Sequence, residues 1–232
     1  IESLSKGNKL DRYFDFCLWI TPYDKYQGHS QSLIKSRWFH SEMKIDNSYV
    51  PLIDGSNIHQ YFIDNNPNEW LKYWDHLWAP RQEKFFTHPR IIFRQIISWN
   101  PLKIIAWYTE QSLYFTQIGF SMLSKKDCNL SLLYSTAFIN SKLINFYHKY
   151  KFLDIEKNTF QKILIENAKQ LPILELTNSE QQSFIVLVNK ILEIKKKDQK
   201  ADTSELEGQI DKLVYQLYDL TPEEIAIVEW QV

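Results

Sequence analysis

The chain has 232 residues, enough for one large domain or two small ones with hydrophobic cores. Its composition, 44% hydrophobic and 15% aromatic with only five glycines and eight prolines, is typical of a globular protein and excludes a disordered one. The net charge of −1 excludes the uniformly basic profile of a non-specific nucleic-acid binder. No stretch approaches the roughly 18 apolar residues of a membrane span, so we expect no membrane partner.

The charges are unevenly distributed along the chain. Residues 1–105 hold 13 basic and 11 acidic side chains, residues 106–175 hold 8 and 6, and residues 176–232 hold 6 and 11. This pattern indicates a mildly basic front part that can hold a phosphate backbone. It also indicates an acidic tail that faces a different partner.

Two features of the sequence indicate the redox compartment of the protein and its relation to a longer chain. Cys17 and Cys128 are lone cysteines, which predicts neither a disulfide framework nor a cysteine-based zinc site and favours the reducing cytoplasm. The chain opens on Ile1-Glu2-Ser3 without a methionine or a signal-peptide pattern, so we expect it to be a piece of a longer protein.

The first part of the chain, residues 1–125, alternates short apolar runs with turns and predicts a strand-rich lobe. Its most informative run lies between Pro89 and Pro101, where a strand-like apolar series carries Arg90, Arg94 and Gln95. The predicted strands cover residues 14–20, 91–97, 103–108 and 113–116.

Three tryptophans, Trp70, Trp74 and Trp78, follow one another at four-residue spacing. This spacing places them on one face of a helix predicted over residues 67–77. Such a stripe serves either as a sugar platform or as core, and we favour core.

From residue 129 the pattern becomes helical, which predicts a helical lobe over residues 126–232. A long buried helix is expected over residues 132–147, and Ser179 begins a capping box with Gln182. Two further apolar stripes predict an antiparallel, coiled-coil-like hairpin over residues 179–220, and Thr221-Pro222-Glu223-Glu224 begins a last helix. The predicted fold class is α/β (α+β): a strand-rich lobe followed by this helical lobe.

Signatures of catalysis are missing from the sequence. The six histidines lack metal-ligand spacing, and neither a phosphate-binding glycine loop nor a nucleophile elbow is present. Asn66-Pro67 and Asn100-Pro101 lack the second proline of amino-methyltransferase motifs, and the Glu-x-Lys triplets at 42–44 and 193–195 lack the partner of a nuclease site. We therefore expect this segment to catalyse nothing and to hold no metal or cofactor.

Several separate blocks together resemble one family, the TaqI-like C-terminal specificity domain of type IIG restriction–modification enzymes and adenine-specific DNA methyltransferases. The similarity covers about residues 20–195. The blocks are residues 23–41, 49–61, 78–81, 86–96, 138–147 and 171–173 with the Ser-Glu-Gln-Gln segment that follows.

The resemblance implies a function for the chain. In that family the domain follows a methyltransferase domain, sometimes with a nuclease domain before it, and clamps double-stranded DNA while an adenine is extruded. The expected partners are therefore duplex DNA and the upstream domain, in a bacterial cytoplasm. S-adenosylmethionine and the catalytic motifs are expected in the upstream part.

Candidate DNA contacts are chosen on chemical grounds, because the family's motifs do not fix them. Arg94, Gln95 and Arg90 are candidates for base edges, since their planar donors match guanine and adenine. The resemblance places Arg90, like Arg81, in the shared framework, which favours a structural or phosphate-binding role for both.

The remaining candidates lie in loops before the central strand. Lys25, Lys35 and Arg37 lie near the Gly28-His29-Ser30 turn and are candidates for phosphate contacts or for a loop that enters a groove. Arg81 and Lys84 suit either base or phosphate contact. Each is equally well explained as a solvated or ion-paired surface charge. Residues 140–142 are expected to interrupt or open a helix and to pack against the front lobe.

Two other functions remain open. The front lobe could pack on the parent's catalytic domain while the hairpin mediates self-association. Alternatively, the three tryptophans could bind carbohydrate, which requires exposed, coplanar indoles.

Overall fold

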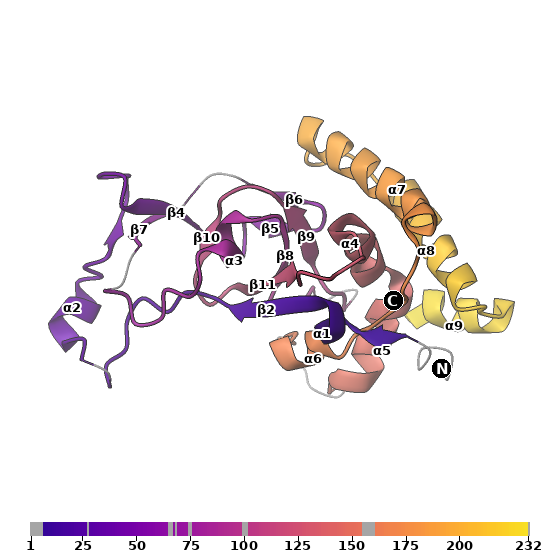
Figure 1. Ribbon diagram of the computed structural model, residues 1–232, viewed down its shortest axis with the longest axis horizontal. Helices are drawn as coiled ribbons and strands as arrows, with labels where there is room; N and C mark the ends of the chain where they lie inside the picture. Colours follow the sequence, from indigo (N-terminus) through magenta and orange to yellow (C-terminus); the bar gives the residue numbers. More distant parts are fainter. Residues whose placement is uncertain are drawn as a thin grey trace.

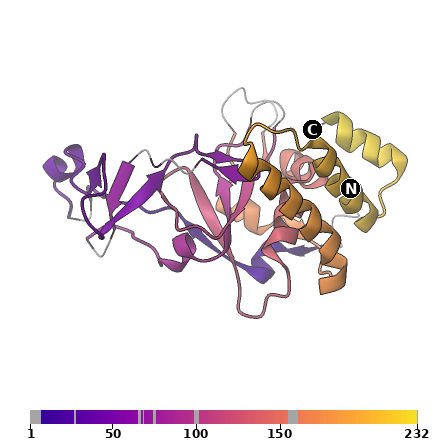
Figure 2. The same cartoon turned by 90° about the horizontal axis from the view of Figure 1, so that it is seen from above.

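The computed structural model describes residues 7–26, 28–64, 67, 69–73, 76–98, 102–154 and 161–231. The molecule is elongated: a small sheet and helix α2 (Gln31–Lys35) lie at one end, a central sheet lies in the middle, and the C-terminal helices lie at the other end (Figure 1). The same order of parts is seen from above (Figure 2). This mixture of sheets and helices confirms the predicted fold class.

The central sheet is antiparallel throughout, and Phe120 lies opposite both Leu18 and Phe93. Three of the predicted strands are confirmed here, with ends shifted by a few residues. The strands lie in the order β2 (Phe14–Leu18), β11 (Gly119–Ser124), β8 (Arg90–Arg94) and β9 (Ala106–Thr109).

Both faces of the central sheet are covered, which explains why β8 is a continuous apolar run instead of an alternating one. Ile91 and Phe93 point into the apolar cluster that contains the C-terminal helices, and Ile92 points into a second cluster on the opposite face. All three side chains are fully buried.

A second four-stranded sheet extends away from the central one. Its β10–β4 pair is parallel and its other pairs are antiparallel, and the strand expected over residues 113–116 is confirmed in it. A short hairpin, β5 (Ile58–His59) with β6 (Phe62–Ile63), lies nearby. The sheet order is β10 (Tyr114–Phe115), β4 (Tyr49–Ile53), β7 (Glu69–Lys72) and β3 (His40–Ser41).

The helix predicted over residues 67–77 is wrong. Residues 69–72 form strand β7, in which Trp70 lies opposite Ser41 and Pro51. Pairing with two neighbouring strands therefore prevails over the tryptophan spacing. Trp74 lies outside the described residues.

The helix expected over residues 132–147 is instead two helices, α4 (Leu132–Asn140) and α5 (Lys142–Phe152). Ser141 separates them in an extended conformation (φ −65°, ψ 153°), and its hydroxyl accepts a hydrogen bond from the N–H of Ile144. The Asn140 side chain exchanges two hydrogen bonds with the backbone of Ala106 in β9, at 2.8 and 3.1 Å. The expected packing of residues 140–142 on the front lobe is thereby confirmed.

The C-terminal helices are α7 (Asn178–Lys197), α8 (Ser204–Leu217) and α9 (Pro222–Gln231). Helix α7 begins two residues earlier than expected, because Thr177 and Glu180 form its capping box. The capping pair Thr221–Glu224 at the start of α9 is confirmed by two hydrogen bonds of 3.0 and 3.3 Å. The apolar stripe of α8 packs on the body of the molecule, with Ile210 buried.

The remaining elements connect the main layers. Strand β1 (Asn8–Lys9) pairs with β12 (Pro172–Ile173), which brings the two predicted lobes together. A single apolar cluster joins strands before residue 125 to helices after it and includes Phe93, Phe138 and Val188. Within the described residues, no helix is long and apolar enough to cross a membrane. The short helices are α1 (Leu10–Tyr13), α3 (Lys84–Thr87) and α6 (Ile165–Lys169).

Candidate nucleic-acid interface

Arg90, at the start of β8, is completely buried. Its guanidinium donates hydrogen bonds to the carbonyl oxygens of His88 (2.8 Å), Gln111 (2.8 Å) and Leu113 (3.2 Å). Burial lowers the pKa of Arg90 to about 10, which leaves it charged at neutral pH. The Arg90 side chain holds two loops against the strand and exposes no surface to a ligand.

Arg94 and Gln95 lie at the opposite end of β8 and are half-buried. Their backbone N–H groups donate to Ile105 (2.9 Å) and Ile118 (2.7 Å), so the position of both residues is fixed by the sheet. Strand alternation places Arg94 on the same face of the sheet as Arg90. These are the sequence candidates that combine a rigid backbone with a partly exposed planar donor.

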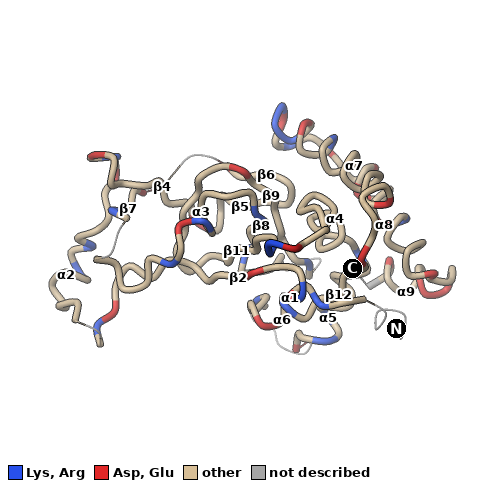
Figure 3. The backbone as a smooth tube through the Cα atoms, viewed as in Figure 1, with Lys and Arg blue, Asp and Glu red and all other residues tan. Residues whose placement is uncertain are grey.

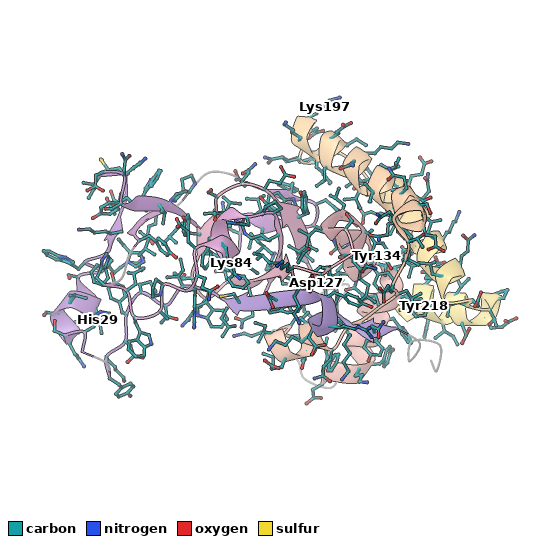
Figure 4. The ribbon with its side chains drawn as sticks, viewed as in Figure 1. His29, Lys84, Asp127, Tyr134, Lys197 and Tyr218 are labelled. Carbon is teal, nitrogen blue, oxygen red and sulfur yellow. The ribbon has the colours of Figure 1, made fainter. Side chains whose placement is uncertain are left out.

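Arg81 lies in the loop that leads into α3, and Lys84 is the first residue of this helix, where a loop position was expected. Arg81 has a left-handed backbone (φ 65°), and its Nε donates to the carbonyl oxygen of Trp19 at 3.2 Å. The ammonium group of Lys84 lies 5.1 Å from the centroid of the Phe85 ring, and the side chain is exposed (Figure 4). Burial raises the pKa of Cys17 in β2, and the positive charges of Arg81 and Lys84 oppose this rise, which places both cations near Cys17.

Lys25, Lys35 and Arg37 lie at the far end of the molecule, near His29 (Figure 4). All three are exposed, and Lys35 ends helix α2. Arg37 is already paired: its Nη2 contacts both carboxylate oxygens of Glu69, at 2.5 and 2.7 Å. This pairing reduces the charge that Arg37 offers to a phosphate.

Stacked aromatic rings fix the conformation of this end. The Tyr23 ring stacks on Phe39 with 5.2 Å between centroids, and its hydroxyl lies 2.8 Å from Nδ1 of His40. Burial, and then the charge of Arg37, lowers the pKa of His40 to about 4, so this histidine is neutral at physiological pH. The loop that carries Lys35 and Arg37 is thus anchored to β3.

Sequence reasoning missed two exposed aromatic residues here. Tyr26 and Trp38 are 81% and 70% exposed, and they adjoin Lys25 and Arg37. Large exposed aromatics are typical of surfaces that bind other molecules. The signal in the sequence that could have identified these two aromatic residues was their position beside basic residues in turns.

The sequence candidates therefore form three separate groups along one elongated molecule: the far end, the α3 loop and the end of β8. Figure 3 shows the positive segments spread in this way. In the described part of the chain, no group of histidine, cysteine and acidic residues has the arrangement of a metal site. An extended ligand suits this distribution better than a small molecule does.

Comparison with known proteins identifies relatives of the same kind. The TaqI-like C-terminal specificity domain matches residues 50–173. A putative type II restriction enzyme and methyltransferase of Methanocaldococcus jannaschii is 25% identical over 195 residues, which are 83% of this chain and 16% of that protein. The chain thus spans a small part of this relative.

Two solved structures resemble the chain to different degrees. MmeI, described as a type IIL restriction–modification enzyme in complex with DNA, superposes with a TM-score of 0.59 over 94% of this chain and 34% of its own, at 9% identity. The HsdS subunit from Thermoanaerobacter tengcongensis gives a TM-score of 0.49 over 94% of this chain and 49% of that subunit, also at 9% identity. At such identities the MmeI likeness concerns the fold alone.

Proposed function

This chain belongs to the family of TaqI-like C-terminal specificity domains, and from that membership we propose that it recognises a specific sequence of double-stranded DNA for a restriction–modification enzyme. The match over residues 50–173 carries the proposal, because it includes three of the four strands of the central sheet. The specificity domain is the non-catalytic part of such enzymes.

We propose further that the chain acts as one side of a clamp. The other side is a methyltransferase domain earlier in the same protein, as the name of the Methanocaldococcus relative suggests. Extruding an adenine costs a few kcal/mol of stacking and pairing, so the duplex must be gripped from outside the catalytic domain. In this proposal S-adenosylmethionine and any endonuclease activity belong to the preceding domains, and the enzyme acts in the bacterial cytoplasm.

The residues proposed to read bases are Arg94 and Gln95. Their planar side chains form paired hydrogen bonds with guanine and adenine edges, and the sheet holds their backbones rigidly. Lys25, Lys35, Arg81 and Lys84 are proposed as phosphate contacts, because all four are exposed cations. Arg37 contributes least, since a phosphate must compete with Glu69 for it.

The first experiment asks whether the chain selects a sequence. It would be incubated with a pool of duplexes that carry a randomised centre, and the retained duplexes would be sequenced over several rounds. We expect one short sequence to be enriched. Retention of an unselected pool at every salt concentration would contradict sequence recognition.

The second experiment assigns the reader. We expect Arg94→Ala to weaken binding to the selected duplex by about 1–3 kcal/mol, roughly 5- to 150-fold, and to relax selection at one base pair. Lys212→Ala, on the exposed surface of α8, is the matched loss of one positive charge and should leave both affinity and selection almost unchanged. Fluorescence anisotropy with labelled duplexes measures the first effect and repeated selection measures the second.

A structural role is the second candidate, and the surface of α9 favours it. Ile227 and Trp230 on this helix are 54% and 84% exposed, although Val228 between them is buried. Exposed apolar side chains on a C-terminal helix suit packing against another domain or a second copy. Sedimentation of the chain and of its Trp230→Ser variant would show whether this helix mediates self-association.

A further inference from the structure

The lysines of the C-terminal helices are concentrated at one point. Residues 176–232 contain six lysines and no arginine, and four of these lysines lie within six residues. They form the α7 tip, defined as Lys195, Lys196, Lys197 and Lys200 at and after the C-terminal end of α7. Figure 3 shows this positive segment, and Figure 4 labels Lys197 within it. The acidic charge of the tail therefore conceals a local basic site.

The two sides of α7 differ in charge near this tip. On one side, Lys195 and Lys196 face the edge of β6 and β9 across a cleft of about 400 Å³, in which Glu110 is the acidic residue. Glu110 is engaged there by the hydroxyl group of Tyr108. On the other side, Lys190 and Lys197 share a separate cleft with three acidic residues, Glu193, Asp202 and Glu205. Only the side that faces β6 and β9 offers an anion a net positive surface.

Lys195 is held in place at the rim of the β6–β9 cleft. Its ammonium group donates to the carbonyl oxygen of Ala201 at 2.8 Å and lies 6.0 Å from the centroid of the Phe62 ring. Lys196, the next residue, is exposed. The four lysines also outweigh Asp198, which lies among them, and the roughly half negative charge at a helix C-terminus.

A stacked pair of aromatic rings adjoins this cleft through Phe62, which lines it. The His59 ring stacks on Phe62, with 4.3 Å between centroids and an angle of 4° between planes. Burial lowers the pKa of His59, and the charges of Arg94 and Lys195 lower it further. Strand β6, which carries Phe62, packs against β9, and β9 pairs with β8. The central sheet therefore connects the cleft at the α7 tip to the strand that ends at Arg94.

We propose that the α7 tip is a second contact to the DNA backbone, in which Lys195 and Lys196 bind phosphates of the duplex that Arg94 reads. This inference rests on the proposed function and assigns part of it to a helix that sequence analysis placed in an acidic tail. A backbone phosphate is the occupant because lysine acts as a point charge without the geometry for base recognition. The Phe62 ring is occupied by His59 and Lys195, so it is not a platform for a base.

Salt dependence tests the inference directly. The affinity of the chain for a fluorescein-labelled duplex of random sequence would be measured at several NaCl concentrations, for the wild type and for Lys196→Gln. Loss of one phosphate contact lowers the slope of log K against log salt by about 0.9. We expect this reduction for Lys196→Gln and for Lys195→Gln, and a reduction of about twice that size for the double variant.

Lys190→Gln is the matched control, because Lys190 lies on the same helix and lines the cleft on the acidic side. It removes the same charge, and we expect the slope to stay unchanged. Thermal unfolding monitored by circular dichroism would verify that Lys195→Gln, which loses a bond to Ala201, is still folded.

The outcomes separate the two proposals. Equal slopes for Lys196→Gln, Lys190→Gln and the wild type would overturn the α7 contact and leave DNA recognition intact. Failure of the wild-type chain to bind any duplex, even at low salt, would overturn DNA recognition by this chain and the α7 contact with it.

Discussion

At the scale of single residues, Arg90 and Arg94 show how two arginines of one strand acquire opposite roles. They are four residues apart and point to the same face of the central sheet. The backbone at residue 88 and at residues 111–113 closes over Arg90 but not over Arg94. We expect Arg90→Met to lower the free energy of unfolding by about 3 kcal/mol or more, because three buried carbonyl groups lose their charged donor. Arg94→Met is the matched substitution at a half-buried position and should change stability by less than about 1 kcal/mol. Urea denaturation would measure both, and equal losses would contradict this assignment.

The burial of Asp211 in α8 makes the stability of the protein depend on pH. Its carboxylate is buried and accepts a hydrogen bond from the N–H of Lys142 at 2.8 Å, at the start of α5. Burial raises its pKa from 3.8 to about 6. The native state therefore binds more protons than the unfolded state between these values, so this group's contribution to stability is complete below pH 3.8 and is lost as pH rises to about 6.

Asp211→Asn tests this effect, because asparagine keeps the acceptor oxygen and cannot ionise. Relative to the wild type, we expect the variant to gain about 3 kcal/mol of stability between pH 4 and pH 7, from a shift of about two units. Burial lowers the pKa of His148 to about 4, which acts in the opposite direction but cancels in the comparison because both proteins contain it. Unfolding curves at several pH values would measure the difference, and parallel pH profiles would show that Asp211 titrates normally.

At the scale of elements, close approach of β11 and β8 makes glycine necessary at position 119. A Cβ atom at Gly119 would lie 2.2 Å from the carbonyl oxygen of Phe93, a backbone atom that cannot move without separating the strands. We expect Gly119→Ala to destabilise the protein by about 1–3 kcal/mol. Gly208→Ala in α8 is the control: a Cβ there meets nothing within 4 Å, and the change should stabilise the helix by about 0.5–1 kcal/mol. Destabilisation by both, measured in urea, would contradict this explanation.

Element types were predictable from the sequence where one periodicity dominates. Three strands of the central sheet and the last three helices follow from continuous apolar runs and from helical stripes with capping residues, whereas β11, between β2 and β8, was not predicted. The segment at Trp70 was not predictable, because a four-residue spacing keeps side chains on one face of a helix and of a strand alike. Only pairing with β3 and β4, which are distant in sequence, decides between them.

The same limit applies to helix ends and to the candidate site. The apolar stripe runs without a break from α4 into α5, and the hydroxyl of Ser141 ends one helix and caps the next. The strand pattern alone does not distinguish Arg90 from Arg94, and only the family resemblance assigned Arg90 to the framework, since loop closure over Arg90 depends on contacts 21 and 23 residues away. The α7 tip was missed because it was counted within an acidic segment, whereas charge acts locally.

At the scale of the whole molecule, the predicted boundary at residue 125 raises the question of whether the helical lobe is a detachable arm. Helices α7 and α8 place Phe184, Val188, Ile210 and Val214 in the apolar cluster that also contains Phe93. Each such side chain contributes about 1.5–3 kcal/mol through burial, against a total stability of about 5–15 kcal/mol for a typical domain. The sum of these four contributions is therefore comparable to the stability of the entire protein.

A chain that ends at residue 175 should consequently fail to fold, since its central sheet would expose one apolar face. We expect it to be insoluble or to show no cooperative transition when urea denaturation is monitored by circular dichroism. A chain that ends at residue 220 loses only α9, whose Val228 is fully buried and whose Glu229 forms a half-exposed ion pair with Lys142 at 3.6 Å. We expect the chain that ends at residue 220 to keep a cooperative unfolding transition, with a lower urea midpoint than that of the full chain. Cooperative unfolding of the 175-residue chain would instead show that the strand-rich lobe is an independent domain, and that the DNA-reading surface does not depend on the helices for its stability.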